Sequence, residues 1–154
     1  MKKISFLLVM LTTMLAVSLS SCEKMGENDG VRGFWRLVSV KTGDVETDVT
    51  NDNIFWGLQN GIISIRCYSA TFAQFEGGEP CNELIGKYHI GSNILAFDEL
   101  YEHYDNHDER IQEISQSMKK CGIIKENPQF AVIEKSADRL TLKCDDTILT
   151  LIQN

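Results

Sequence analysis

The dipeptide Asn60-Gly61 constrains the fold of this chain more than any other feature of its sequence. It lies between two apolar runs, and Asn-Gly in that setting is typical of a two-residue type I′ β-hairpin. A turn centred there pairs Leu58 with Ile63 and gives the hairpin one nearly all-apolar face. Because a shift of one residue would turn that face into water, the register is well determined. The residues of the face are Ile54, Trp56, Leu58, Ile63, Ile65 and Cys67.

Two further turns divide apolar runs in the same way, at Ser92-Asn93 and at Asp145-Asp146. Each brings alternating apolar residues of its two arms onto one face. The pairs predicted around them are Tyr88 with Phe97, Ile90 with Leu95, Leu140 with Leu151 and Leu142 with Leu149. Strands are also expected at 33–41 and 130–133, whereas the alternation over 68–76 is less clear.

One stretch has the period of a helix. Its apolar residues recur at helical spacing and predict an amphipathic helix over 108–120. Asn106 and Glu109 resemble a capping box, and Gly122 stands where a helix ends. The apolar stripe is Ile111, Ile114, Met118 and Cys121. The expected fold class is therefore all-β, an antiparallel up-and-down barrel of about eight strands with one amphipathic helix.

The N-terminal segment has the layout of a secretory signal peptide, because two lysines precede an apolar stretch over 4–17. A membrane-spanning helix would need roughly 20 apolar residues, which is more than this stretch has. The stretch leads into Leu19-Ser20-Ser21-Cys22, which resembles a bacterial lipobox. The cysteine of such a motif becomes the lipidated first residue of the mature chain, so Cys22 is the expected lipid attachment site.

The predicted signal peptide and lipid attachment site divide the chain into three parts. We expect a signal peptide over 1–21, a polar and flexible tether over 22–32, and a barrel domain over 33–154. The lipid on Cys22 makes the membrane the first expected partner. The expected location is the bacterial cell envelope.

Three segments resemble lipocalin-like bacterial lipoproteins. Gly33-Phe34-Trp35 resembles the Gly-x-Trp motif that opens lipocalin barrels, and residues 86–95 resemble a hairpin of the lipocalin-like domains of gut-type anaerobes. The double hairpin over 131–151 fits the closing strands of such a domain. The resemblance covers residues 33–154 and implies a lipocalin-like barrel.

Charge and motifs argue against several classes of function. The net charge of −7 argues against nucleic acid as a partner, since phosphate binding needs a basic surface. Serines with the strand-turn-helix context of a nucleophile elbow are missing, as is a glycine-rich phosphate loop, so we name no catalytic residue and no cofactor. His103 and His107 lie four apart among acidic residues. That spacing suits a metal site on a helix, but a solvated acidic loop is the favoured interpretation.

The inward aromatic residues support two different functions. They either fill the barrel as plain core or line a cavity for a small apolar or amphipathic ligand. The leading hypothesis is a non-enzymatic, lipid-anchored binding protein, and the alternative is an envelope interaction module with a filled barrel. An envelope hydrolase is the third class. The expected lining residues are Trp56, Leu58, Ile63, Ile65, Tyr88, Phe97 and Leu142.

Four cysteines remain once Cys22 carries lipid, and an even number in an exported domain suggests disulfides. The favoured pair is Cys81 with Cys121, followed by Cys67 with Cys144. Free thiols that pack as small core residues are the alternative.

Overall fold

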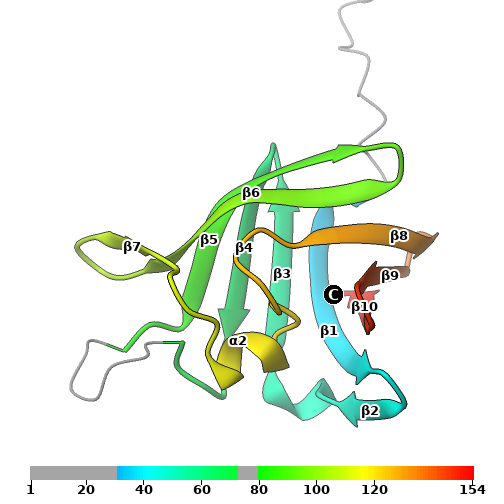
Figure 1. Ribbon diagram of the computed structural model, residues 1–154, viewed down its shortest axis with the longest axis horizontal. Helices are drawn as coiled ribbons and strands as arrows, with labels where there is room; N and C mark the ends of the chain where they lie inside the picture. Colours follow the sequence, from blue (N-terminus) through cyan, green and yellow to red (C-terminus); the bar gives the residue numbers. More distant parts are fainter. Residues whose placement is uncertain (1–30, 73–79) are drawn as a thin grey trace, which may run out of the picture.

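A computed structural model of the protein describes residues 31–72 and 80–154 and shows a closed antiparallel β-barrel (Figure 1). The predicted signal peptide, Cys22 and most of the tether lie outside these residues. Eight strands form the ring in the order β1-β3-β4-β5-β6-β8-β9-β10, and β10 pairs with β1 to close it. The all-β antiparallel barrel of eight strands expected from the sequence is confirmed.

Two strands lie outside the ring: β2 pairs with β1, and β7 pairs with β6. The bounds of all strands are β1 Gly33–Thr42, β2 Val45–Asp48, β3 Ile54–Gln59, β4 Ile62–Cys67, β5 Glu83–Gly91, β6 Ile94–His103, β7 Asp108–Arg110, β8 Gln129–Lys135, β9 Arg139–Cys144 and β10 Thr147–Gln153. A short 3-10 helix, η1 Thr50–Asp52, leads from β2 into β3.

The three predicted hairpin registers are confirmed. Leu58 lies opposite Ile63, Tyr88 opposite Phe97, and Leu142 opposite Leu149. Asn60 and Gly61 have φ angles of 53° and 77°, as the two central residues of a type I′ turn require. The possible strand over 68–76 is not found at 68–72, and its remaining residues lie outside the described part.

The predicted helix over 108–120 is mostly wrong. Residues 108–110 form β7, which extends the edge of β6, and only α2 Gln116–Lys120 is helical. The N-cap is Ser115, whose hydroxyl accepts a hydrogen bond from the Met118 N–H at 3.2 Å, and not Asn106. The predicted stop is correct, because Gly122 adopts φ +88° directly after the helix.

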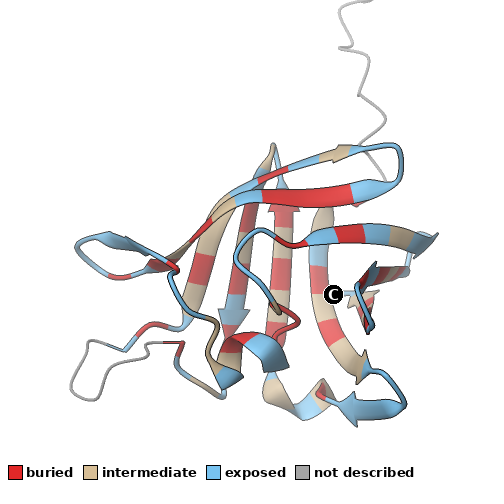
Figure 2. Cartoon of the chain, viewed as in Figure 1, coloured by how far each residue is buried: buried red, intermediate tan, exposed pale blue. Residues whose placement is uncertain are grey.

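The inward side chains of the ring form one core, visible as alternating buried and less buried bands along the strands (Figure 2). The rings of Trp56, Phe97 and Phe130 contact one another with centroids 5.5–5.7 Å apart. Helix α2 adds Met118, which is fully buried in the same cluster. The Nε1–H of Trp56 donates to the carbonyl of Cys121 at 3.2 Å, which ties the end of α2 to β3.

Candidate ligand-binding site

All seven residues predicted to line the barrel are buried on its inner side. Six of the side chains are 0–2% exposed, and Tyr88 is 6% exposed. They belong to one continuous cluster, so the structure brings the predicted residues together. The members are Trp56, Leu58, Ile63, Ile65, Tyr88, Phe97 and Leu142.

One lateral row of this inner face ends in a carboxyl group. Residues that lie directly opposite each other on antiparallel strands share a face, so the cross-strand pairs can be followed round the ring. The row begins on β1 and crosses β3, β4, β5 and β6. Its members in order are Trp35, Trp56, Ile65, Leu84 and Glu102.

Glu102 is buried, and only one of its two carboxyl oxygens has a hydrogen-bond partner among the described residues. The residue is 5% exposed, and its Oε2 accepts a hydrogen bond from the hydroxyl of Tyr104 at 3.1 Å. Its Oε1 is closed to solvent and has no hydrogen-bond partner among the described residues. Burial raises the pKa of Glu102, and the charge of Glu109 across the β6–β7 pair raises it further. A buried polar atom without a partner is rare in folded proteins and calls for an explanation.

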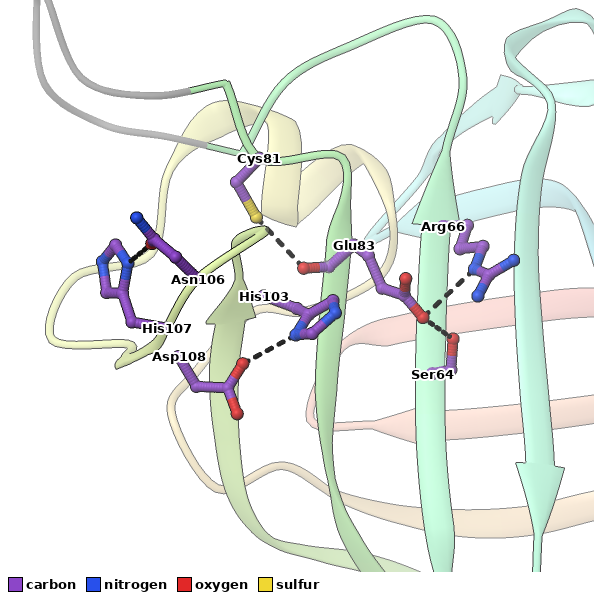
Figure 3. A network of polar contacts seen from close by, with 8 residues as sticks. All are labelled: Ser64, Arg66, Cys81, Glu83, His103, Asn106, His107 and Asp108. Atoms are coloured by element: carbon purple, nitrogen blue, oxygen red, sulfur yellow. Dashed lines mark hydrogen bonds and ion pairs between the residues drawn. The ribbon is translucent and has the colours of Figure 1, made fainter.

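Two neighbouring carboxylates, Glu83 on β5 and Asp108 on β7, do have partners (Figure 3). Glu83 accepts from Ser64 at 2.6 Å and pairs with Arg66 at 3.1 Å. Asp108 pairs with His103, with 2.7 Å between Nδ1 and Oδ1. These side chains are partly solvated, and the segment predicted as an acidic loop is in part a strand pair, because His103 ends β6 and Asp108 begins β7. Within residues 31–72 and 80–154, no three His, Cys, Asp or Glu side chains converge where a metal ion could be held.

The sequence did not predict an inward position for Glu102, because the register of β6 is irregular. Lys87 lies opposite Glu99 but Tyr88 lies opposite Phe97, so β6 has one residue more than β5 at this point. Strict alternation from Phe97 would place residues 99, 101 and 103 inward. The extra residue moves Leu100 and Glu102 inward instead. The sequence signal was the apolar residue at position 100, which breaks the alternation set by the turn.

The cysteines also differ from expectation. Cys67, Cys81, Cys121 and Cys144 are all buried free thiols, so neither predicted pairing is formed. The Cys81 thiol donates to the carbonyl of Glu83 at 3.1 Å. Cys121, which follows α2, instead lies beside Cys67, and the Cys67 Sγ is also 3.6 Å from the Ser69 Oγ. The neighbouring Cys121 thiol lowers the pKa of Cys67 to about 5, and the same interaction raises the pKa of Cys121.

The comparisons agree with the fold. The profile of the lipocalin-like domain family matches residues 17–153, so the chain belongs to that family. A lipocalin-like protein from Bacteroides uniformis ATCC 8492 superposes with a TM-score of 0.56 at 17% sequence identity, covering 81% of this chain and 99% of that one.

A second solved structure is an uncharacterized protein from Bacteroides eggerthii DSM 20697. It has a TM-score of 0.49 at 14% identity and covers 80% of this chain and 98% of its own. A search of curated proteins finds no match. Among the described residues, no helix combines the length and hydropathy that a bilayer crossing requires.

Proposed function

We propose that the barrel binds a small amphipathic molecule, with Glu102 as the acceptor for its polar head. The single observation that carries this proposal is the Oε1 of Glu102, which has no partner in the part of the chain that the structure describes and ends an otherwise apolar row. Ligand sites in proteins combine a mostly apolar lining with few polar groups that fix orientation. The apolar part of the ligand would lie along Trp56, Ile65 and Leu84, beside the carboxyl group.

The surroundings of Glu102 favour an amine head group. Glu109 adds a second acidic side chain across the strand pair, and Tyr104 already uses its hydroxyl on Oε2. A carboxylate head would be repelled there, whereas an ammonium group can donate to Oε1 and offset the negative charge. We therefore propose a cationic amphiphile as the ligand class and a binding protein, not an enzyme.

The experiment is a titration followed by tryptophan fluorescence. The chain has two tryptophans, and both belong to the row that ends in Glu102. Residues 22–154 with Cys22→Ser would be titrated with dodecylamine and with dodecanoate. Dodecylamine is expected to change the emission and dodecanoate to change it far less.

Glu102→Gln provides the decisive variant. Loss of a hydrogen bond to a charged group costs about 1.5–3 kcal/mol, so dodecylamine should bind about 10- to 150-fold more weakly. Glu99→Gln is the matched control, because Glu99 lies on the same strand and bonds to Tyr101 on the outer side at 2.9 Å. Equal affinity of all three proteins for dodecylamine would refute the role of Glu102.

The second part of the proposal is a lipid anchor at Cys22 that holds the barrel in the bacterial cell envelope. It rests on the lipobox-like Leu19-Ser20-Ser21-Cys22 and the apolar stretch before it. Cells grown with labelled palmitate should label the wild-type protein and not Cys22→Ala. An unlabelled wild-type protein would contradict the anchor.

One observation favours the alternative, an envelope interaction module with a filled barrel. Trp56, Phe97 and Phe130 contact one another across the interior, as packed core residues do. Under this alternative no amphiphile binds inside, and the fluorescence titration gives no saturable change with either probe.

A further inference from the structure

The outer surface of β1, β3 and β4 carries aromatic side chains that the barrel core does not use. Phe34 is 43% exposed and its ring stacks on Phe55 with centroids 5.2 Å apart. Tyr68, at 65% exposure, meets Phe55 edge-on at 5.9 Å. Ile62 adds a further exposed side chain on the next strand. We call Phe34, Phe55, Ile62 and Tyr68 the aromatic face.

Basic side chains surround the aromatic face. Phe55 lies between Arg36 and Arg66 in the strand pairing, and Lys87 lies opposite Ile62. Arg32 stands at the start of β1 and donates to Asn60. Arg66 is paired with Glu83 at 3.1 Å, so its charge is offset. Arg32, Arg36 and Lys87 still place basic side chains beside exposed aromatic ones in a chain whose net charge is −7, a local feature that the overall composition does not predict.

The face also contains a depression. It encloses about 550 Å³ beside Phe34 and is open on one side. Gly57 helps to form it, because the space where a side chain would stand is bounded by Phe34 at 3.7 Å. The lining residues are Arg32, Gly33, Phe34, Gly57, Leu58 and Gln59.

We infer that the aromatic face lies against the membrane leaflet that holds the Cys22 lipid. This inference rests on the proposed anchor, and two features of the chain support it. From Cys22 to Phe34 is 34 − 22 = 12 residues, and a chain of that length spans at most about 40 Å. The anchor thus keeps the N-terminal end of β1, where Phe34 lies, close to the bilayer.

Charge complementarity is the second support. Aromatic rings and arginine or lysine side chains are the groups enriched at the membrane–water interface. Bacterial leaflets that contain anionic lipids attract the basic side chains around the aromatic face, and they repel the acidic remainder of the barrel. Both forces turn the aromatic face toward the lipid.

The experiment uses the full lipidated protein in vesicles of phosphatidylethanolamine and phosphatidylglycerol. Hydroxyl-radical oxidation, mapped by mass spectrometry, reports which side chains the lipid covers. Phe34 and Tyr68 should be oxidised several-fold more slowly in these vesicles than in detergent micelles. The matched controls are Val45 and Ile133, which are 69% and 55% exposed outside the aromatic face and should keep their rates.

A charge variant tests the electrostatic part. One basic side chain near an anionic surface contributes about 1 kcal/mol, so Lys87→Gln should shift the ratio of covered to uncovered protein about fivefold. Lys143→Gln, on β9, removes an exposed charge elsewhere and should leave the ratio unchanged. The effect should vanish in vesicles of phosphatidylcholine alone.

Three outcomes overturn the inference, and each is distinct from failure of the anchor. Protein that enters vesicles but leaves Phe34 and Tyr68 as reactive as in micelles excludes contact between the face and the lipid. Protection that depends on protein density in the vesicles indicates a second copy as the occupant. If Phe34 and Tyr68 are protected equally in the wild type and in Lys87→Gln, and equally in phosphatidylcholine vesicles, the charge argument is excluded. Protein that does not enter vesicles at all contradicts the Cys22 anchor itself.

Discussion

Replacing Glu102 with glutamine should stabilise the barrel, and the gain should depend on pH. Among the described residues, Oε1 of this 5%-exposed carboxyl group has no partner and Oε2 has one hydrogen bond. A buried group that lacks its partner costs about 1–3 kcal/mol, and more when it is charged. Glutamine keeps the shape and an oxygen for Tyr104, but its amide N–H groups would lack a partner as well, so the gain comes from removing the buried charge alone. Glu102→Gln should therefore raise the free energy of unfolding by about 1–3 kcal/mol where the wild-type carboxyl is ionised.

The sign of the pH dependence follows from the raised pKa of Glu102. The folded protein holds this proton more tightly than the unfolded chain, whose carboxyl has its ordinary pKa of 4.5. The contribution of Glu102 to the wild-type free energy of unfolding then falls as pH rises from 4.5 through the raised pKa. The advantage of Glu102→Gln should be small at the acid end of that window and largest above it.

Urea unfolding followed by tryptophan fluorescence at a series of pH values measures this difference. Glu99→Gln, on the outer side of β6, should change stability by less than about 0.5 kcal/mol at every pH. A Glu102→Gln variant that is less stable than wild type above neutral pH would refute the reasoning. So would a stability difference that does not vary with pH.

Two other substitutions test the packing. Leu142→Ala removes a fully buried side chain of β9 and should lower the free energy of unfolding by about 2–5 kcal/mol. Lys143→Ala, at the exposed neighbouring position, should change the free energy of unfolding by less than about 0.5 kcal/mol. Equal losses in urea melts would mean that the faces of β9 are assigned wrongly. Gly122→Ala adds a methyl group that would lie 2.6 Å from a buried leucine of β10, at a φ of +88°, and should cost about 1–3 kcal/mol. Gly43 also has a positive φ, +59°, but open space surrounds the position of a new methyl group. Gly43→Ala should therefore lower the stability less than Gly122→Ala in thermal melts. An equal loss of stability in the two variants would exclude the packing contribution.

The hairpins could be predicted because each turn fixes the register of both arms. Asn60-Gly61 sets the alternation of β3 and β4, and no irregularity interrupts either strand. The barrel and most of its lining follow from such local signals. Closure between β1 and β10 joins the two ends of the described domain, and it was predicted from the strand count and the need to remove exposed edges as well as from the resemblance to lipocalin-like barrels.

The carboxyl group of the candidate site could not be predicted in the same way. The extra residue of β6 reverses the alternation beyond Phe97, and the only local signal is the apolar residue at position 100, which does not fix where between Phe97 and Leu100 the extra residue falls. The helix prediction failed for a related reason. Ile111 and Met118 are buried as predicted, but the residues before Ile111 pair with the edge of β6, which satisfies their backbone groups better than an isolated helical turn.

Native mass spectrometry of the protein extracted from its own membrane tests the central claim most directly. Wild-type protein and Glu102→Gln would be purified in parallel from the same cells and their masses compared. We expect a small molecule that copurifies with the wild-type barrel, carries an amine, and is lost or strongly reduced in Glu102→Gln. A wild-type barrel that carries no such molecule, or one retained equally by both proteins, would contradict binding through Glu102.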